Sequence, residues 1–204
     1  MFTKAITKKP CKALINGIST AQFGEGTPDY EKAVKQHDKY VETLRSLGLE
    51  VTDLEADERF PDSCFVEDPA VVMERCAIIT NPATDSRNAE KFEIIKTIRK
   101  FYDEEQIFHI EAPGTLEGGD VMRVGDHFYV GLSDEAFKGF NRFVVDADEL
   151  YAVNSLNING TVLVPAGYPK TQKIIEDLGY PVILMDTNEF RLIDGSLTCL
   201  SLRF

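Results

Sequence analysis

The sequence lacks the apolar segments that would place it in or across a membrane. None of its apolar runs approaches the roughly 18 residues that a spanning helix needs. The N-terminus, "MFTKAITKKPCKALING", has no apolar core of signal-peptide length. We therefore expect a cytoplasmic protein that does not bind membranes.

Cysteine is scarce and widely spaced. The four cysteines are Cys11, Cys64, Cys76 and Cys199, and none of them forms a CxxC pair. This spacing speaks against a zinc site and against a dense disulfide framework, so we expect reduced thiols and no bound metal.

Basic clusters are also missing. The chain has 34 acidic against 22 basic residues, a net charge of -12, and no basic block. A nucleic-acid partner is therefore not expected, whereas a small cationic ligand suits the charge. With 43% hydrophobic residues, the 204-residue chain can bury a substantial core and is expected to form a single domain over residues 1–204.

A module repeats along the chain. The segments "LGLEVTDLEADE" at 47–58 and "LGYPVILMDTNE" at 178–189 share a Leu-Gly pair, a central valine and a final glutamate in register. Each follows an expected helix, at 28–47 and about 170–178, and contains a strand. The repeating unit is strand, turn, strand, loop, helix, strand, about 40 residues long, which is typical of a propeller or solenoid.

The hairpins identify two full copies and one incomplete copy. "AVVM" and "CAIIT" flank a turn at 74–75 and precede a helix expected over 85–102, with Ala89, Phe92, Ile95 and Ile98 facing inward. "SLNIN" and "TVLVP" precede the 170–178 helix. The hairpin "DVMRV" and "HFYVG" is followed only by room for a short strand near 143–145, so we expect a piece of module size to be missing near 133–136.

Acidic side chains gather in one loop, "FPDSCFVEDP". Asp62, Glu67 and Asp68 place three carboxylates within seven residues. A solvated acidic loop is the plain interpretation. The flanking Phe60 and Phe65 favour a loop packed inward, where carboxylates need a cationic partner or hydrogen-bond donors.

Three further residues suggest chemistry at strand or helix ends. Glu117 in "GTLEGGDV" precedes two glycines that permit close backbone approach, although a plain glycine-rich turn fits as well. Arg87 in "TDSRNAE" begins a helix and can bind a carboxylate in a bidentate manner, although most arginines lie on the surface. Cys199 lies in an expected terminal strand as a nucleophile or as a buried structural thiol.

Together these groups suit a ligand with a planar cation at one end and a carboxylate at the other. Carboxylates accept from guanidinium N–H groups, an arginine binds the carboxylate, and a thiolate can attack the guanidinium carbon. Because acidic surroundings disfavour a thiolate, we expect it to depend on the bound cation or on a protonated histidine.

Several segments, in order along nearly the whole chain, resemble the dimethylarginine dimethylaminohydrolases of the guanidine-modifying amidinotransferase superfamily. They are "FPDSCFVEDP", "APGTLEGGDV", "NGTVLVPAGYPKT" and "DGSLTCLSLRF". The resemblance implies an α/β fold, a pentein-type α/β propeller of repeated strand-strand-helix-strand modules. It also implies hydrolysis of asymmetric dimethylarginine or monomethylarginine to citrulline and a methylamine, without metal or organic cofactor.

The resemblance also implies residue roles. Cys199 is the nucleophile that forms a covalent thiouronium intermediate, and Glu117 orients the catalytic histidine and the substrate. The implied substrate-binding residues are Ile18, on a mobile loop over the pocket, Asp62, Glu67, Asp68 and Arg87. A homodimer is left open.

The chain departs from the family at its general acid and base. The family histidine in an "LHLK"-like segment has no counterpart, since none of His37, His109 and His127 falls at its position. A second carboxylate-binding arginine usually follows "GLS", where this chain has Asp134 and Glu135. Slow turnover is therefore expected. A naturally shortened, non-catalytic guanidine-binding protein and an arginine deiminase-like hydrolase stay open as alternatives.

Overall fold

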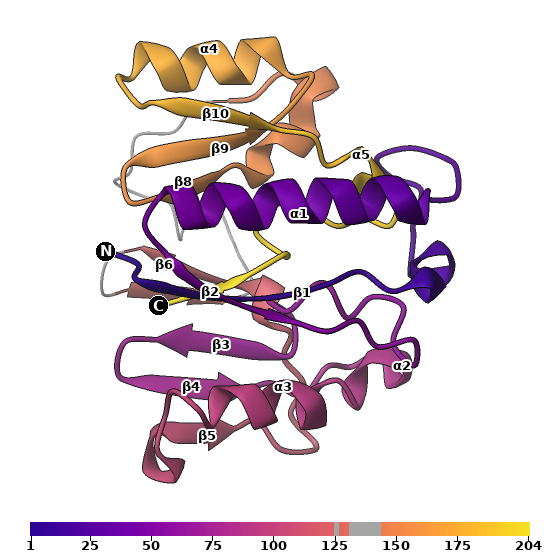
Figure 1. The fold of residues 1–204 in the computed structure, drawn as a ribbon, viewed down its shortest axis with the longest axis vertical. Helices are drawn as coiled ribbons and strands as arrows, with labels where there is room; N and C mark the ends of the chain where they lie inside the picture. The colour runs from indigo at the N-terminus through magenta and orange to yellow at the C-terminus, as the bar shows by residue number, and fades with distance from the viewer. Residues whose placement is uncertain (125–126, 131–143) are drawn as a thin grey trace. The chain divides into compact units, whose positions relative to one another are not determined.

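The predicted strand-turn-strand-helix-strand module occurs three times in the described residues of the computed structural model, which are 1–124, 127–130 and 144–204 (Figure 1). In each copy, two strands pair antiparallel and a helical crossover leads to a third strand parallel to the second. The parallel step needs a crossover because a tight turn cannot join parallel strands.

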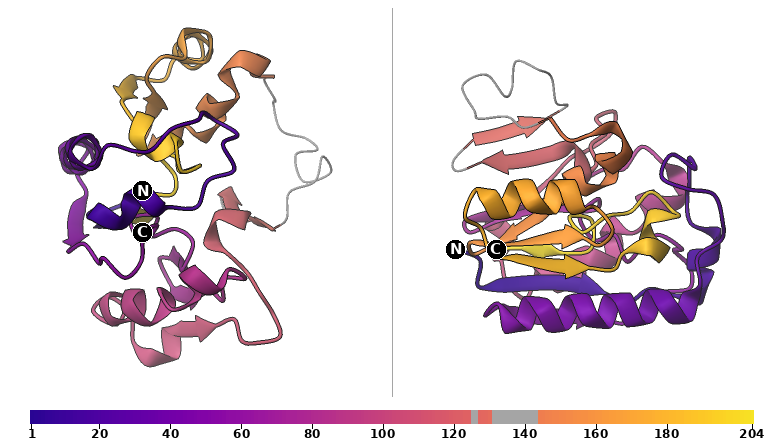
Figure 2. Two further views of the ribbon diagram at one scale, coloured as in Figure 1. Left: turned by 90° about the vertical axis from the view of Figure 1, so that its right-hand side faces the viewer. Right: turned by 90° about the horizontal axis from the view of Figure 1, so that it is seen from above.

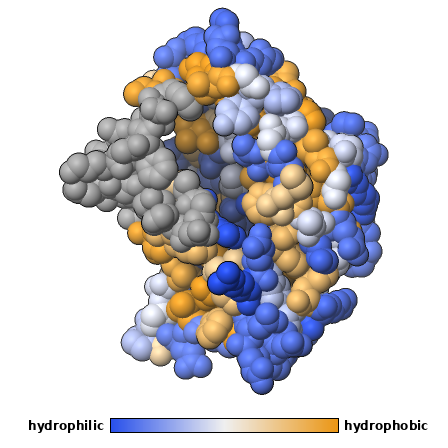
Figure 3. Space-filling view, turned by 90° about the vertical axis from the view of Figure 1, so that its left-hand side faces the viewer, coloured by the Kyte–Doolittle hydropathy of each residue, from blue (hydrophilic) through white to orange (hydrophobic). Residues whose placement is uncertain are grey.

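Two copies follow chain order. The first consists of β3 (Ala70–Met73), β4 (Cys76–Ile79), the helices α2 (Asp85–Asn88) and α3 (Lys91–Ile98), and β5 (Ile107–His109). The second consists of β8 (Leu156–Ile158), β9 (Thr161–Pro165), α4 (Pro169–Asp177) and β10 (Val182–Met185). The outer side of α4, at the top of Figure 3, is hydrophilic, as expected for a helix that covers one edge of its module.

The third copy joins the two ends of the chain. The C-terminal β11 (Leu202–Arg203) pairs antiparallel with β1 (Lys4–Lys8), and α1 (Tyr30–Ser46) then leads to β2 (Glu50–Leu54), which is parallel to β1. The termini accordingly lie side by side (Figure 2). A further hairpin of β6 (Val121–Val124) and β7 (His127–Val130) forms a sheet of its own.

Two helix predictions need correction. The first helix begins after Asp29, whose side chain accepts from the Lys32 backbone N–H at 3.1 Å, and not after Thr27. The second is interrupted at Ala89–Glu90 and ends at Ile98. Ile95 and Ile98 are buried as predicted, but Ala89 is exposed and Phe92 is 62% exposed, because the interruption resets the helical phase.

The incomplete module lies partly outside the described residues. Residues 133–136, where we expect a piece to be missing, lie outside the described residues. Position 143, the first residue of the short strand expected at 143–145, also lies outside them. Val144 and Val145 are not part of a strand. Within the described residues, no helix is both long and apolar enough to cross a membrane.

The contacts divide the chain into two compact units. Unit 1 consists of Met1–Val66 and Asp146–Phe204, and unit 2 of Glu67–Val145. In unit 1, Tyr40 is buried in the core, and its hydroxyl donates to the Leu197 carbonyl at 3.1 Å and lies 2.7 Å from Ser201 Oγ. The core therefore fixes the segment that precedes β11.

His37 of α1 is fully buried in unit 1. Neither ring nitrogen has a hydrogen-bond partner among the described residues, although Nε2 lies 3.5 Å from Asp53 Oδ1. Burial lowers the pKa of His37, and this effect outweighs the carboxylates of Asp53 and Asp38, which act to raise it; Lys9 adds to the lowering. His37 is thus neutral in the folded protein.

We expect the free energy of unfolding to fall as the pH drops below about 6.5, because unfolded His37 takes up a proton that folded His37 does not. The slope attributable to this group is at most about 1.4 kcal/mol per pH unit. Urea unfolding of the wild type and His37→Gln between pH 7.5 and 5 measures it, with His109→Gln, at an exposed position, as control. Parallel pH profiles for the wild type and His37→Gln would contradict the assignment.

Candidate active site

Cys199 lies in a turn at residues 197–200 and not in the terminal strand that the sequence suggested. Leu197 and Leu200 are both fully buried, and this spacing of three suits a turn, whereas a strand would alternate with a period of two. The strand β11 begins only at Leu202. The Cys199 side chain is partly buried against the core, and its sulfur lies 3.5 Å from Ser196 Oγ.

Tyr151 holds the start of this turn in place. It lies in the 3-10 helix η5 (Ala147–Asn154), and its hydroxyl donates to the Gly195 carbonyl at 2.8 Å and lies 3.1 Å from Thr187 Oγ1. Burial raises the pKa of Tyr151, so it stays protonated as a donor. Gly195 itself packs on Phe65, since a Cβ there would come 2.1 Å from the ring.

A loop at residues 17–27, between the 3-10 helix η1 (Lys12–Asn16) and α1, is fastened to the segment that leads to Cys199. Ser19 Oγ donates to the Leu192 carbonyl at 2.8 Å, and the Thr20 backbone N–H donates to Asp194 Oδ2. Arg191 donates to the Phe23 carbonyl, and Phe23 packs edge-on against Tyr151. The loop and the nucleophile segment therefore share one hydrogen-bonded frame.

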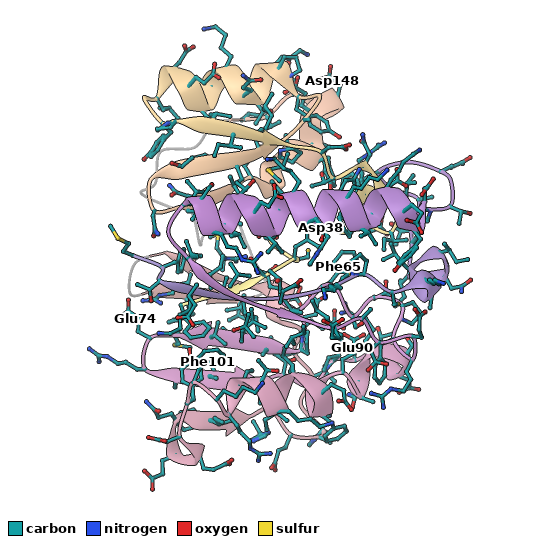
Figure 4. The ribbon with its side chains drawn as sticks, in the orientation of Figure 1. Asp38, Phe65, Glu74, Glu90, Phe101 and Asp148 are labelled. Atoms are coloured by element: carbon teal, nitrogen blue, oxygen red, sulfur yellow. The ribbon has the colours of Figure 1, made fainter. Side chains whose placement is uncertain are left out.

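Asp62 and Ile18 meet at the beginning of this loop. The Ile18 backbone N–H donates to Asp62 Oδ1 at 3.0 Å, and Asp62 is only 5% exposed, whereas the Ile18 side chain is 45% exposed. The inward-packed interpretation of the acidic loop is therefore correct for Asp62. Phe65 is buried as predicted (Figure 4), while Phe60 is only partly buried.

In unit 2, backbone contacts fix Glu117 beside the second half of the acidic loop. The Leu116 N–H donates to the Asn81 carbonyl at 3.1 Å, and the Gly118 N–H donates to the Asp68 carbonyl at 2.9 Å. A Cβ on Gly118 would lie 2.0 Å from the Glu67 carbonyl oxygen. The expected close backbone approach is thus present at Gly118, whereas a Cβ on Gly119 would meet the Asp68 side chain at 2.8 Å.

Arg87 is buried, not exposed, and is held by carboxylates of its own unit. Its Nε and Nη2 donate to the two oxygens of Glu90 at 3.0 and 2.8 Å, and its Nη1 donates to Asp68. Burial acts to lower the pKa of Arg87, but the carboxylates of Glu90 and Asp68 outweigh it and raise the pKa, so Arg87 is always charged. Glu90 (Figure 4) was missed at the sequence level, although its spacing of three from Arg87 is a signal for a helical ion pair.

The structure thus groups the candidate residues in two sets. Cys199, Asp62 and Ile18 belong to unit 1, and unit 2 contributes the remaining four, which are Glu67, Asp68, Arg87 and Glu117. Tyr151 and Ser196 were also missed, because neither belongs to a charged cluster. Tyr151 acts through contacts distant in sequence, whereas Ser196 lies within "DGSLTCLSLRF", three residues before Cys199, and this closeness is a signal that could have identified it.

The repeated modules and the thiol in the last turn define a pentein-type α/β protein. A solved cyanobacterial arginine dihydrolase aligns with a TM-score of 0.83 at 14% identity, covering all of this chain and 40% of that one, which shows a shared fold. The family model described as "N,N dimethylarginine dimethylhydrolase, eukaryotic" matches residues 5–153.

Two relatives that match nearly the whole chain carry the same name. The N(G),N(G)-dimethylarginine dimethylaminohydrolase of Pseudomonas aeruginosa is 37% identical, with complete coverage of both chains. The enzyme of the same name from Streptomyces coelicolor is 30% identical over 98% of this chain and 96% of its own. A solved dimethylarginine dimethylaminohydrolase aligns with a TM-score of 0.94 over all of both chains. The chain belongs to the dimethylarginine dimethylaminohydrolase family.

The alignment with the P. aeruginosa relative is longer than the chain itself. It spans 257 positions, against 204 residues here, so at least 53 positions, the difference of these two numbers, have no residue of this chain opposite them. This length is comparable to one module of about 40 residues.

Proposed function

We propose that this chain carries out dimethylarginine dimethylaminohydrolase chemistry on methylated arginine, with Cys199 as the nucleophile. The observation that carries the proposal is the full-length relation at 37% identity to an enzyme of that name. The turn at Cys199 adds support, because it keeps the thiol partly exposed on a rigid frame. A thiol that served only packing would not need this exposure.

The reaction is balanced by one water molecule. The Cys199 thiolate attacks the guanidinium carbon, the carbon–nitrogen bond to the methylated nitrogen breaks, and that nitrogen leaves with a proton as dimethylamine or methylamine. A thiouronium remains on the sulfur. Water then adds to its carbon, the carbon–sulfur bond breaks, and citrulline and the thiolate are released.

The acidic residues are assigned to the cationic end of the substrate. Asp62, Glu67 and Asp68 accept from its N–H groups, and Glu117 polarises the guanidinium. For Asp62, the hydrogen bond from Ile18 supports an ionised carboxylate, since an N–H donor favours the charged form. Ile18 then belongs to the loop that covers the substrate.

Arg87 is assigned to the carboxylate end of the substrate. Its contacts with Glu90 and Asp68 neutralise much of its charge, so a substrate carboxylate would have to share the guanidinium with them. These three carboxylate oxygens, two from Glu90 and one from Asp68, therefore set a limit on the affinity that this residue alone can supply.

Departure of the amine is the difficult step for this chain. An amine cannot leave as an anion, and a general acid and base typically contribute about 100-fold to 10,000-fold. No histidine stands at the family position, and His37 is buried and neutral in the core. We therefore expect slow or absent steady-state turnover of dimethylarginine.

Two alternatives have support of their own. The 53 or more unmatched positions favour a shortened guanidine-binding protein without turnover. An arginine deiminase-like activity fits the shared fold of the arginine dihydrolase, although the likeness at 14% identity extends to the fold alone. A cytoplasmic location and a homodimer remain predictions from the sequence.

A substrate with a better leaving group separates these possibilities. One solved relative is a histidine-to-glycine variant as an adduct with S-methyl-L-thiocitrulline. In this compound a thiolate leaves in place of an amine and needs no proton. We expect this chain, at a verified mass of 22.9 kDa, to release one equivalent of methanethiol and to form an adduct.

The same sample should release citrulline from dimethylarginine only slowly. Its rate of citrulline release from arginine is measured in parallel for comparison. Binding of citrulline without adduct formation would favour the shortened binding protein. Faster citrulline release from arginine than from either methylated arginine would favour the deiminase-like activity. Rapid steady-state release of dimethylamine would contradict the expected lack of a general acid.

A further inference from the structure

The hydroxyl groups around Cys199 form a small cluster whose members come from the same turn. Ser196 Oγ lies 3.5 Å from the Cys199 sulfur and 3.2 Å from Thr198 Oγ1, which itself lies 3.9 Å from the sulfur. Ser196 is only 2% exposed, so water does not easily replace its hydroxyl. The sulfur thus has a buried hydroxyl group beside it that can act as a hydrogen-bond donor.

This contact favours the thiolate over the thiol. With a neutral thiol, the weak S–H donor or the hydroxyl can form the bond, whereas a thiolate accepts a charge-assisted bond from the hydroxyl. A hydrogen bond that is stronger to the charged form shifts ionisation toward that form.

We propose that Ser196 is a positioning residue that donates a hydrogen bond to the Cys199 thiolate and favours its ionisation. Thr198 supports this bond by accepting or donating at Ser196 Oγ. Tyr151 sets the geometry, because its hydroxyl anchors Gly195, the residue immediately before Ser196. The catalytic importance of this hydrogen bond rests on the proposed function. The effect of Ser196 on the ionisation of Cys199 does not.

Alkylation with iodoacetamide tests the proposal on the full chain without any amidine chemistry. The rate of labelling at Cys199 is followed from pH 5.5 to 10 by peptide mass spectrometry, which separates it from the three other cysteines. In Ser196→Ala, we expect the midpoint of the pH–rate profile to rise by about one pH unit, the effect of one hydrogen bond to a charged group.

The labelling rate at pH 7 should fall only about threefold, because the more basic thiolate is also more nucleophilic. Thr198→Val should shift the midpoint in the same direction but less. Ser63→Ala is the matched control, since Ser63 is also a buried serine of unit 1 and its Oγ has no hydrogen-bond partner among the described residues. Ser63→Ala should match the wild type.

An unchanged midpoint in Ser196→Ala, with unfolding in urea like that of the wild type, would overturn the proposal. If Ser196→Ala unfolds more easily, Ser196→Thr decides, because it retains the hydroxyl and should restore the wild-type midpoint. A shifted midpoint without an S-methyl-L-thiocitrulline adduct would support the role of Ser196 and count against the proposed function. An S-methyl-L-thiocitrulline adduct together with an unshifted midpoint in Ser196→Ala would support the proposed function and count against the role of Ser196.

Discussion

Cys199→Ser is expected to abolish adduct formation with S-methyl-L-thiocitrulline and any citrulline release from dimethylarginine. A serine hydroxyl is far less acidic than a thiol and, without a general base, does not become a nucleophile for the guanidinium carbon. Binding should survive, because the substitution replaces one atom and leaves Asp62 and the 17–27 loop in place. Intact mass measures the adduct, and calorimetry with citrulline measures binding.

Cys76→Ser is the matched control for this variant. Cys76 is also a partly buried free cysteine, but it lies on β4 in unit 2 and has no role in the proposed reaction. It should form the adduct like the wild type. Adduct formation at the wild-type rate in Cys199→Ser would remove Cys199 from the mechanism.

Gly118→Ala should destabilise the chain by about 3 kcal/mol or more and displace Glu117. The new Cβ would meet the Glu67 carbonyl oxygen at 2.0 Å and the Ala70 carbonyl oxygen at 2.9 Å, and backbone atoms cannot move aside as a flexible side chain can. The bond from Gly118 N–H to the Asp68 carbonyl would also be strained. Urea unfolding measures the lost stability as a lower urea concentration at the unfolding midpoint.

Gly114→Ala provides a control in the same loop. A Cβ at Gly114 would come no closer than 3.1 Å, to the Glu111 carbonyl oxygen, which a small adjustment can relieve. We expect its unfolding midpoint to lie much nearer to that of the wild type. Equal midpoints for Gly114→Ala and Gly118→Ala would show that the loop is not held as tightly against Glu67 as the structure indicates.

The modules were predictable because their signals are local. Two short, continuous apolar runs and the polar turn between them at 74–75 predicted the hairpin of β3 and β4, and Figure 4 shows Glu74 at that turn. Gly48, with a φ of 90°, ends α1 as expected for a residue in the left-handed region. Short-range patterns of this kind are sufficient to predict elements within a few residues.

Contacts between distant residues were not predictable in the same way. The apolar alternation near Cys199 suggested a strand, but Tyr40 and Tyr151 bind the Leu197 and Gly195 carbonyls and hold a turn instead. Likewise, Arg87 was expected on the surface by default, but its contact with Asp68, 19 residues away along the chain, helps to hold it in a buried position, and no local pattern signals that contact. Tertiary hydrogen bonds overrode the local preference at both places.

The most direct test is to locate the covalent bond. After incubation with S-methyl-L-thiocitrulline, the protein is digested and its four cysteine peptides are analysed by tandem mass spectrometry. The account predicts one modification, on Cys199 in the C-terminal peptide, and its suppression by excess citrulline. Modification of another cysteine in place of Cys199, or an unmodified C-terminal peptide in a sample that has released methanethiol, would contradict it.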